Sequence, residues 1–264
     1  MPLTVETYPS VAEAGRALAA APTSRFFGGG TILMRAVNDA DPSFDTLIRS
    51  TDPALTAIRS QADGVSLGAG VTMAMILAHR DAAFLAPVAR VVGGPQVRAA
   101  ATVAGNLFAA RPYGDFAAAL MALGATAEMS DGRRQPVDDL VRGSAKGLVA
   151  TITVPRPRDG LRFHKVSRVK PKGVSVMSIA AVVPGAGGRV AGARIVFNGM
   201  GPQPQRALAA ERALEGEPLG PQSIMRAAAA AADGFTPQDD ALATAWYRSA
   251  VAGVHLRRLL EGPR

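Results

Sequence analysis

The chain has 264 residues, a formal net charge of +8 and no cysteine. The lack of cysteine excludes disulfide bonds, thiolate zinc sites and cysteine-ligated iron–sulfur clusters within this chain. Hydrophobic residues make up 48% and charged residues 19%, which is typical of a globular protein. This length suits two modest hydrophobic cores.

The sequence shows neither the pattern of a signal peptide nor that of a membrane span. The first residues lack a basic start followed by an apolar run, and no apolar stretch approaches the roughly 20 residues that cross a bilayer. We therefore expect a soluble, cytoplasmic protein. The basic residues are scattered, with no stripe interleaved with aromatic residues. We expect no nucleic-acid partner, because an acidic partner or an anionic cofactor suits this charge better.

The first fifty residues predict a strand, a helix and a second strand. Residues 4–10 form the first strand, Ser10 is placed to cap a helix over residues 11–20, and residues 44–50 form the second strand. Between them, Phe26 and Phe27 lead into a glycine-rich loop.

The next hundred residues alternate between short strands and helices. Two strands are expected around a turn at Asp63 and Gly64, and a hairpin is expected with its tip at Asp131 and Gly132. Three helices are expected at residues 71–80, 86–94 and 116–125, and a final strand at residues 147–157. Residues 67–73 carry two of the three glycines of a dinucleotide fingerprint, which we interpret as a strand-to-helix turn.

The last third predicts a three-stranded antiparallel sheet followed by three helices. Alternating apolar residues from 163 to 198 indicate the strands, and the helices are expected at residues 206–216, 221–234 and 239–262. Residues 156–160 have the composition of a linker. The fold class is therefore α+β, with a first domain over 1–158, made of subdomains at about 1–55 and 56–158, and a second over 159–264.

Two glycine-rich loops carry the functional signal. Residues 26–33 read FFGGGTIL, and residues 101–115 read ATVAGNLFAARPYGD. Glycine leaves main-chain N–H groups bare, and the hydroxyl of Thr31, the hydroxyl of Thr102 and the amide of Asn106 can bind phosphate oxygens. The three histidines (His79, His164 and His255) lie far apart, and no nucleophile motif occurs. The pattern predicts a diphosphate-bearing cofactor, with no catalytic residue and no metal site.

The chain resembles the FAD-binding medium subunits of the molybdenum hydroxylases, of the xanthine dehydrogenase and carbon monoxide dehydrogenase type. Residues 27–33 resemble the family's A-G-G-T-D-L loop, and residues 93–115 resemble its long signature that ends in G-G-N and P-x-[GS]-D. Residues 163–181 are similar to the segment that opens the family's C-terminal domain. The resemblance covers essentially the whole chain and implies the two-subdomain PCMH-type FAD-binding fold.

The resemblance also implies which residues bind FAD. The two loops wrap the diphosphate, Asp115 contacts the sugar chain unless it serves only as a helix N-cap, and Val92 and Val149 flank the cofactor. His164 or Lys165 approaches the flavin, and we favour Lys165. The implied set is Phe27, Gly28, Gly29, Gly30, Thr31, Ile32, Leu33, Val92, Thr102, Val103, Ala104, Gly105, Asn106, Asp115, Val149 and Lys165.

The sequence departs from the family pattern at three places. Ile32 replaces an acidic residue, and Ala104 replaces the first glycine of the G-G-N triplet. If position 104 requires a positive φ, alanine strains the loop by about 1 kcal/mol or more. The segment between Gly143 and Leu148 is also shorter than in the family. These departures motivate an alternative, a structural subunit that has lost FAD.

The resemblance implies an electron-transfer role within a larger enzyme. A large partner subunit carries the molybdenum cofactor, and a small partner subunit carries two [2Fe-2S] clusters. FAD on this chain accepts electrons from those clusters and delivers them to an external acceptor, in a heterotrimer or a dimer of heterotrimers. The absence of cysteine agrees, because this chain cannot hold the clusters itself. A stand-alone flavin oxidase is the second alternative; it needs its own catalytic base, and none is evident.

Overall fold

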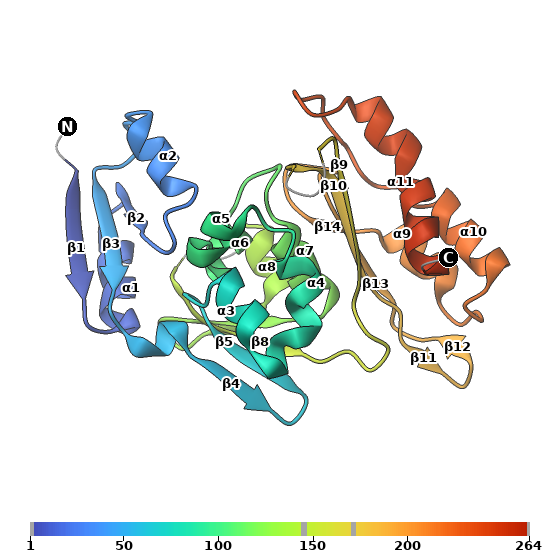
Figure 1. Ribbon diagram of the computed structural model, residues 1–264, viewed down its shortest axis with the longest axis horizontal. Coiled ribbons are helices and arrows are strands. Elements are labelled where there is room, and N and C mark those ends of the chain that lie inside the picture. The colour runs from blue at the N-terminus through green and yellow to red at the C-terminus, as the bar shows by residue number, and fades with distance from the viewer. Residues whose placement is uncertain (1–2, 144–146, 170–172, 263–264) are drawn as a thin grey trace.

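The computed structural model describes residues 3–143, 147–169 and 173–262, and its three main sheets follow one another along the chain (Figure 1). The first strands lie at one end of the molecule, the central helices and strands in the middle, and the C-terminal helices at the other end. The predicted shortening between Gly143 and Leu148 involves residues 144–146, which lie outside the described residues.

The first sheet is parallel and has three strands in the order β1-β3-β2: β1 (Thr4–Tyr8), β3 (Thr46–Ser50) and β2 (Ser24–Phe26). Helix α1 (Val11–Ala20) connects β1 to β2, and the Ser10 hydroxyl accepts a hydrogen bond from the N–H of Glu13, as expected of an N-cap. Ala14 of α1 packs on Ile48 of β3. Helix α2 (Leu33–Asn38) was not predicted, since its single exposed turn and a half buries no residue and shows no apolar period.

The second sheet is antiparallel, with the order β4-β5-β8-β6-β7. Its strands are β4 (Ile58–Gln61), β5 (Gly64–Gly68), β6 (Thr126–Met129), β7 (Arg134–Pro136) and β8 (Val149–Pro155). Both predicted turns, at Asp63 with Gly64 and at Asp131 with Gly132, join neighbouring strands as expected. The local turn signals were sufficient here because each hairpin is contiguous in sequence.

Short helices pack against this sheet and carry the second glycine-rich loop. They are η1 (Pro53–Thr56), α3 (Met73–Ala78), η2 (Arg80–Leu85), α4 (Ala86–Ala89), α5 (Pro95–Ala100), α6 (Val103–Leu107), α7 (Asp115–Ala122) and α8 (Val137–Val141). The stretch from 101 to 115 is thus not a plain turn, because α6 lies within it. Every residue of α7 is buried, so this helix is surrounded by protein.

The third sheet has four strands rather than the three predicted, in the order β14-β13-β10-β9. These are β9 (Arg162–Ser167), β10 (Ser175–Val182), β13 (Arg194–Asn198) and β14 (Gln205–Arg206), and a small hairpin of β11 (Gly185–Ala186) and β12 (Arg189–Val190) stands apart. The two residues of β14 are too few to show strand periodicity in the sequence, and only their pairing with β13 reveals them.

Strand β10 is buried on both faces. Ala180 and Val182 belong to the same core as α7 and the second sheet, whereas Ile179 and Ala181 belong to the core beneath the C-terminal helices. Successive side chains of a strand point to opposite faces, so a strand packed on both sides needs a continuous apolar run. The C-terminal sheet therefore shares its hydrophobic core with the part that precedes it, and the division of the chain at 158/159 stays a prediction.

Three helices cover the far face of the third sheet: α9 (Leu208–Leu214), α10 (Pro221–Ala229) and α11 (Ala245–Glu261). The last was predicted to start at residue 239, but Thr244 is its N-cap and accepts a hydrogen bond from the N–H of Tyr247. Residues 239–243 instead form a bent connection, in which the N–H of Asp240 donates to the carbonyl of Ala243 at 3.1 Å. Within the described part of the chain, no helix is long and apolar enough to cross a membrane.

Helix α2 begins at an unfavourable residue, which gives a first testable prediction. Ile32 is the N-cap, its side chain is 41% exposed, and it makes no capping hydrogen bond. Replacement by aspartate places a negative charge at the N-terminus of the helix, so Ile32→Asp should stabilise the FAD-free protein by about 0.5 kcal/mol, seen as a Tm about 1–2 °C higher. The matched control Ile32→Leu should give no gain; equal Tm values for the two variants would contradict the prediction.

Candidate functional site

The first glycine-rich loop follows β2 and ends at α2. The N–H of Phe27 makes the last ladder bond, to the carbonyl of Ile48 at 2.7 Å. Gly30 has a φ of +68°, a left-handed conformation that suits glycine, and its carbonyl accepts from the N–H of Met34. The main-chain N–H groups of residues 28–32 donate to none of the residues that the structure describes. They form a row of available donors at the surface end of a strand.

The second loop uses its main chain differently. The N–H of Val103 donates to the carbonyl of Val71 at 2.9 Å, that of Ala104 donates to the carbonyl of Ala69 at 3.1 Å, and that of Gly105 donates to the Thr102 hydroxyl at 3.0 Å. The protein itself therefore satisfies these main-chain donors. What this loop can offer a ligand is the hydroxyl hydrogen of Thr102 and the side-chain amide of Asn106.

The turn at residues 67–73 is the strand-to-helix turn predicted from the sequence, with Thr72 capping α3. Its carbonyls hold the second loop, and Thr72 forms an isolated bridge with Thr102. Sequence reasoning missed this support role, because it depends on a pairing between segments thirty residues apart.

The expectation of strain at Ala104 is wrong. Ala104 is a helical residue in the first turn of α6, and within the described chain Ala40 is the one residue other than glycine with a positive φ. A helical position accepts alanine readily. The replacement of glycine at position 104 thus gives no reason to expect loss of the cofactor.

Asn106 holds the two ends of the second loop together. Its Oδ1 accepts hydrogen bonds from the N–H groups of Phe116 and Ala117 in the first turn of α7, each at 3.0 Å. Its Nδ2 donates to no described group. The amide hydrogens therefore remain available, while the carbonyl fixes the loop.

The two loops are in direct contact. A Cβ placed on Gly29 would lie 1.7 Å from the carbonyl oxygen of Ala100, and one placed on Gly28 would lie 3.2 Å from the Thr102 hydroxyl oxygen. Only glycine allows the backbone of the first loop to approach so closely at position 29. Gly28 and Gly29 of the first loop thus lie against Thr102 and Ala100, respectively.

Asp115 is the centre of a second cluster, between α7 and the third sheet. The alternative interpretation of Asp115 as an N-cap is wrong: Gly114 occupies that position, and Asp115 is the first helical residue. Its buried carboxylate accepts from the hydroxyls of Ser175 and Ser178 at 2.7 Å and from Asn198 Nδ2 at 3.1 Å. These three partners were missed, although two serines inside an otherwise apolar strand were an available signal.

Lys165 completes this cluster, and the structure separates it from His164. Lys165 Nζ lies 3.1 Å from Asp115 Oδ2 and donates to the carbonyl of Val91 at 2.9 Å, with its side chain 10% exposed. His164 is on the opposite face of β9, where its Nε2 lies 3.1 Å from Nδ1 of His255 on α11. Val92, next to Val91, is half-buried at the edge of the core, whereas the Val149 side chain is fully enclosed in it.

The residues present fit a diphosphate-bearing cofactor. The donors of residues 28–32, the Thr102 hydroxyl and the Asn106 amide are suited to phosphate oxygens, which accept hydrogen bonds and carry negative charge. No group of three or more potential metal ligands occurs among the described residues. Together with the α+β architecture, this pair of contacting loops defines a nucleotide-cofactor-binding protein.

Two family models identify the family. The model described as the FAD binding domain in molybdopterin dehydrogenase matches residues 4–157, and the CO dehydrogenase flavoprotein C-terminal domain matches residues 162–262. The chain belongs to this family and is the FAD-binding subunit of a molybdenum hydroxylase-type dehydrogenase.

The chain aligns with two curated relatives over most of their length. The nicotine 6-hydroxylase medium subunit of Paenarthrobacter nicotinovorans is 27% identical, with 90% of this chain and 88% of that protein covered. The carbon monoxide dehydrogenase medium chain of Afipia carboxidovorans is 28% identical, with 78% and 77% covered.

Solved structures show the same fold. A carbon monoxide dehydrogenase from Hydrogenophaga pseudoflava, which lacks the Mo-pyranopterin moiety of its cofactor, has a TM-score of 0.90 at 26% identity, with 99% of this chain and 96% of that chain covered. Quinoline 2-oxidoreductase from Pseudomonas putida has a TM-score of 0.86 at 22% identity, over 99% and 96%, and supports the fold alone.

Proposed function

We propose that this chain carries FAD and transfers electrons from the [2Fe-2S] clusters of a partner subunit to an external acceptor. The observation that carries the proposal is the set of unused N–H donors at residues 28–32, in a loop whose Gly28 lies against Thr102 of the second loop. Such a site favours a group with several anionic oxygens, and the FAD diphosphate is the one that the family implies. Bound FAD would supply reversible two-electron chemistry that no side chain of this protein offers.

In this proposal the first loop binds the diphosphate through its main chain and the second through side chains. Residues 28–32 donate N–H groups, Thr31 and Thr102 donate hydroxyls, and Asn106 donates its amide. The half-buried Phe27, Leu33 and Val92, with exposed Ile32, exclude water from the cofactor. Val103, Ala104 and Gly105 fix the position of the second loop through their backbone hydrogen bonds to the protein, and Val149 is enclosed in the core.

Asp115 has a more restricted role in the proposal. A carboxylate has about four lone-pair sites, and those of Asp115 already serve two serines, an asparagine and Lys165. A contact with the cofactor's sugar chain must therefore replace one of these bonds. We propose that the main role of Asp115 is to hold Lys165 in place, and that Lys165 contributes positive charge beside the flavin.

The proposed partners follow from what the chain lacks and from its relatives. It has no cysteine, so the clusters that reduce its flavin must be on another chain. The relatives named medium subunit and medium chain support an assembly with a small [2Fe-2S] subunit and a large molybdenum-cofactor subunit, as a heterotrimer or a dimer of heterotrimers. A cytoplasmic location and the absence of a nucleic-acid partner remain part of the proposal.

A visible absorption spectrum of the full-length chain, purified with its partners, tests the proposal. We expect the two absorption bands of a bound flavin and their loss on reduction through the partner clusters. A colourless complex that gains no bands when FAD is added would show the FAD-deficient structural subunit instead. A yellow protein that runs without partners and reduces oxygen with a substrate of its own would show the stand-alone oxidase.

A further inference from the structure

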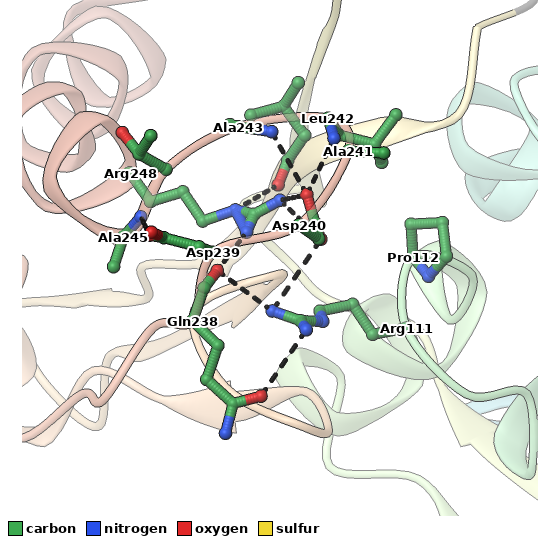
Figure 2. A network of polar contacts seen from close by, with 12 residues as sticks. Arg111, Pro112, Gln238, Asp239, Asp240, Ala241, Leu242, Ala243, Ala245 and Arg248 are labelled. Carbon is green, nitrogen blue, oxygen red and sulfur yellow. Dashed lines mark hydrogen bonds and ion pairs between the residues drawn. The ribbon is translucent and has the colours of Figure 1, made fainter.

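Arg248, on α11, is fully buried, and each of its three guanidinium nitrogens donates a hydrogen bond (Figure 2). Nη2 donates to both carboxylate oxygens of Asp240, at 2.8 and 2.9 Å, and Nη1 donates to the carbonyl of Gln238 at 2.9 Å. Nε donates to the carbonyl of Val176 at 3.2 Å. A guanidinium removed from water in this way is stable only while these acceptors remain in place.

These contacts fix the segment 238–243 between α10 and α11. Asp240 Oδ1 also accepts from the N–H groups of Leu242 and Ala243, at 2.8 and 3.1 Å. Burial raises the pKa of the Asp240 carboxyl. Those two N–H groups, followed by the charges of two arginines, outweigh that effect, so the pKa of Asp240 lies below its ordinary value and the carboxylate stays charged.

The second of those arginines is Arg111, which lies in the second glycine-rich loop. Its Nη1 donates to the carbonyl of Gln238 at 3.3 Å and lies 3.8 Å from Asp240 Oδ2, and its Nη2 donates to Gln238 Oε1 at 3.5 Å. Figure 2 shows Arg111 and Arg248 approaching the segment from opposite sides. The Gln238 carbonyl and Asp240 therefore serve both arginines.

Arg248 also supports the same loop at a second position, Asp115. The carbonyl that accepts from its Nε belongs to Val176, and the preceding residue, Ser175, donates to Asp115 at 2.7 Å. Arg111 contacts two residues that Arg248 holds, Gln238 and Asp240, and Asp115 contacts Ser175, the neighbour of Val176. Between Arg111 and Asp115, the Tyr113 hydroxyl accepts from Arg35 of α2 at 2.8 Å, which connects the loop to the end of the first glycine-rich loop.

We infer that Arg248, acting through segment 238–243 and Arg111, is a positioning residue for the FAD-binding loop at residues 106–115. The inference rests on the proposed function, and it assigns to the C-terminal helix a part in cofactor binding without contact with the cofactor. The loop that carries Asn106 and Asp115 keeps its geometry because polar contacts from the C-terminal part hold it at Arg111 and at Asp115.

The test measures the FAD dissociation constant of the full-length chain, together with its FAD-free Tm. Arg111→Met removes the contacts to Gln238 and Asp240 but leaves Arg248 paired, so the fold should persist. We expect FAD affinity to fall about tenfold or more, since the charge-assisted contacts that hold the middle of the loop are lost. The matched control is Arg226→Met, which removes the same charge from an exposed pair with Glu217 and should leave the affinity unchanged.

Rescue by lysine and spectroscopy of the bound flavin distinguish a positioning role from a merely structural one. Arg111→Lys, which keeps the charge near Asp240, should recover part of the affinity, and Arg111→Met should alter the visible circular dichroism of bound flavin while its FAD-free Tm matches the control. The inference is wrong if the wild type binds FAD and the FAD affinities of Arg111→Met and Asp240→Asn lie within twofold of the control. Wild type that binds no FAD at all would overturn the proposed function together with it.

Discussion

Replacing Gly29 with alanine is expected to weaken FAD binding severely. The new Cβ would lie 1.7 Å from the carbonyl oxygen of Ala100 and 2.6 Å from its carbonyl carbon. Both are main-chain atoms and cannot turn aside, so the two loops must separate. We expect the FAD dissociation constant, measured by fluorescence titration of the full-length chain, to rise about 100-fold.

The control for this variant is Gly220→Ala. Gly220 has an extended backbone with φ of −151°, and nothing lies within 4 Å of a Cβ added there. It therefore tests the loss of glycine without a clash. If Gly29→Ala binds FAD as well as Gly220→Ala does, the contact between the loops is not needed for the cofactor, and the two-loop model of the site is wrong.

Local sequence signals predicted the elements that contacts within a short stretch of chain decide. The N-cap at Ser10, the turn at Asp63 and the hairpin at Asp131 belong to this group, and the structure places each as expected. Helix α2 and strand β14 were missed, because α2 is short and buries no residue, and β14 is defined only by its pairing with β13. The fourth strand of the C-terminal sheet could be found only through its partner β13.

In the candidate site, too, the local features were predicted from the sequence and the contacts between distant segments were not. Glycines in two loops and the family resemblance predicted a site at these two segments, and the structure brings the two loops into contact. The sequence could not show that the carbonyls of Ala69 and Val71 occupy the donors of the second loop. Nor could it show that Asp115 is enclosed by Ser175, Ser178 and Asn198, since these partners come from strands sixty or more residues away. Which residues touch FAD remains a prediction.

Removing the Asp115 carboxylate is expected to cause the largest loss of stability of any single change in the site. Asp115→Ala leaves Lys165 buried without its counter-charge and leaves two serines and an asparagine without their acceptor. Breaking one side of a buried ion pair typically destabilises a protein by about 3–5 kcal/mol. Urea denaturation of the FAD-free chain should show this loss. Glu217→Ala, at an exposed ion pair with Arg226, should lose less than about 1 kcal/mol.

A second pair of variants separates charge from packing at Asp115. Asp115→Asn keeps an oxygen acceptor for Ser175 and Ser178 but leaves the charge of Lys165 unopposed, so most of the loss should remain. Adding Lys165→Met removes that charge, and the double variant should be more stable than Asp115→Asn alone, because removing both partners of a buried pair is far less harmful than removing one. Equal stability of the two would mean that the serine bonds, rather than the ion pair, join α7 to the C-terminal sheet. In either case the contact lies beside Val91 and the loop at 111–115, so the same variants should weaken FAD binding in proportion to how far they loosen this junction.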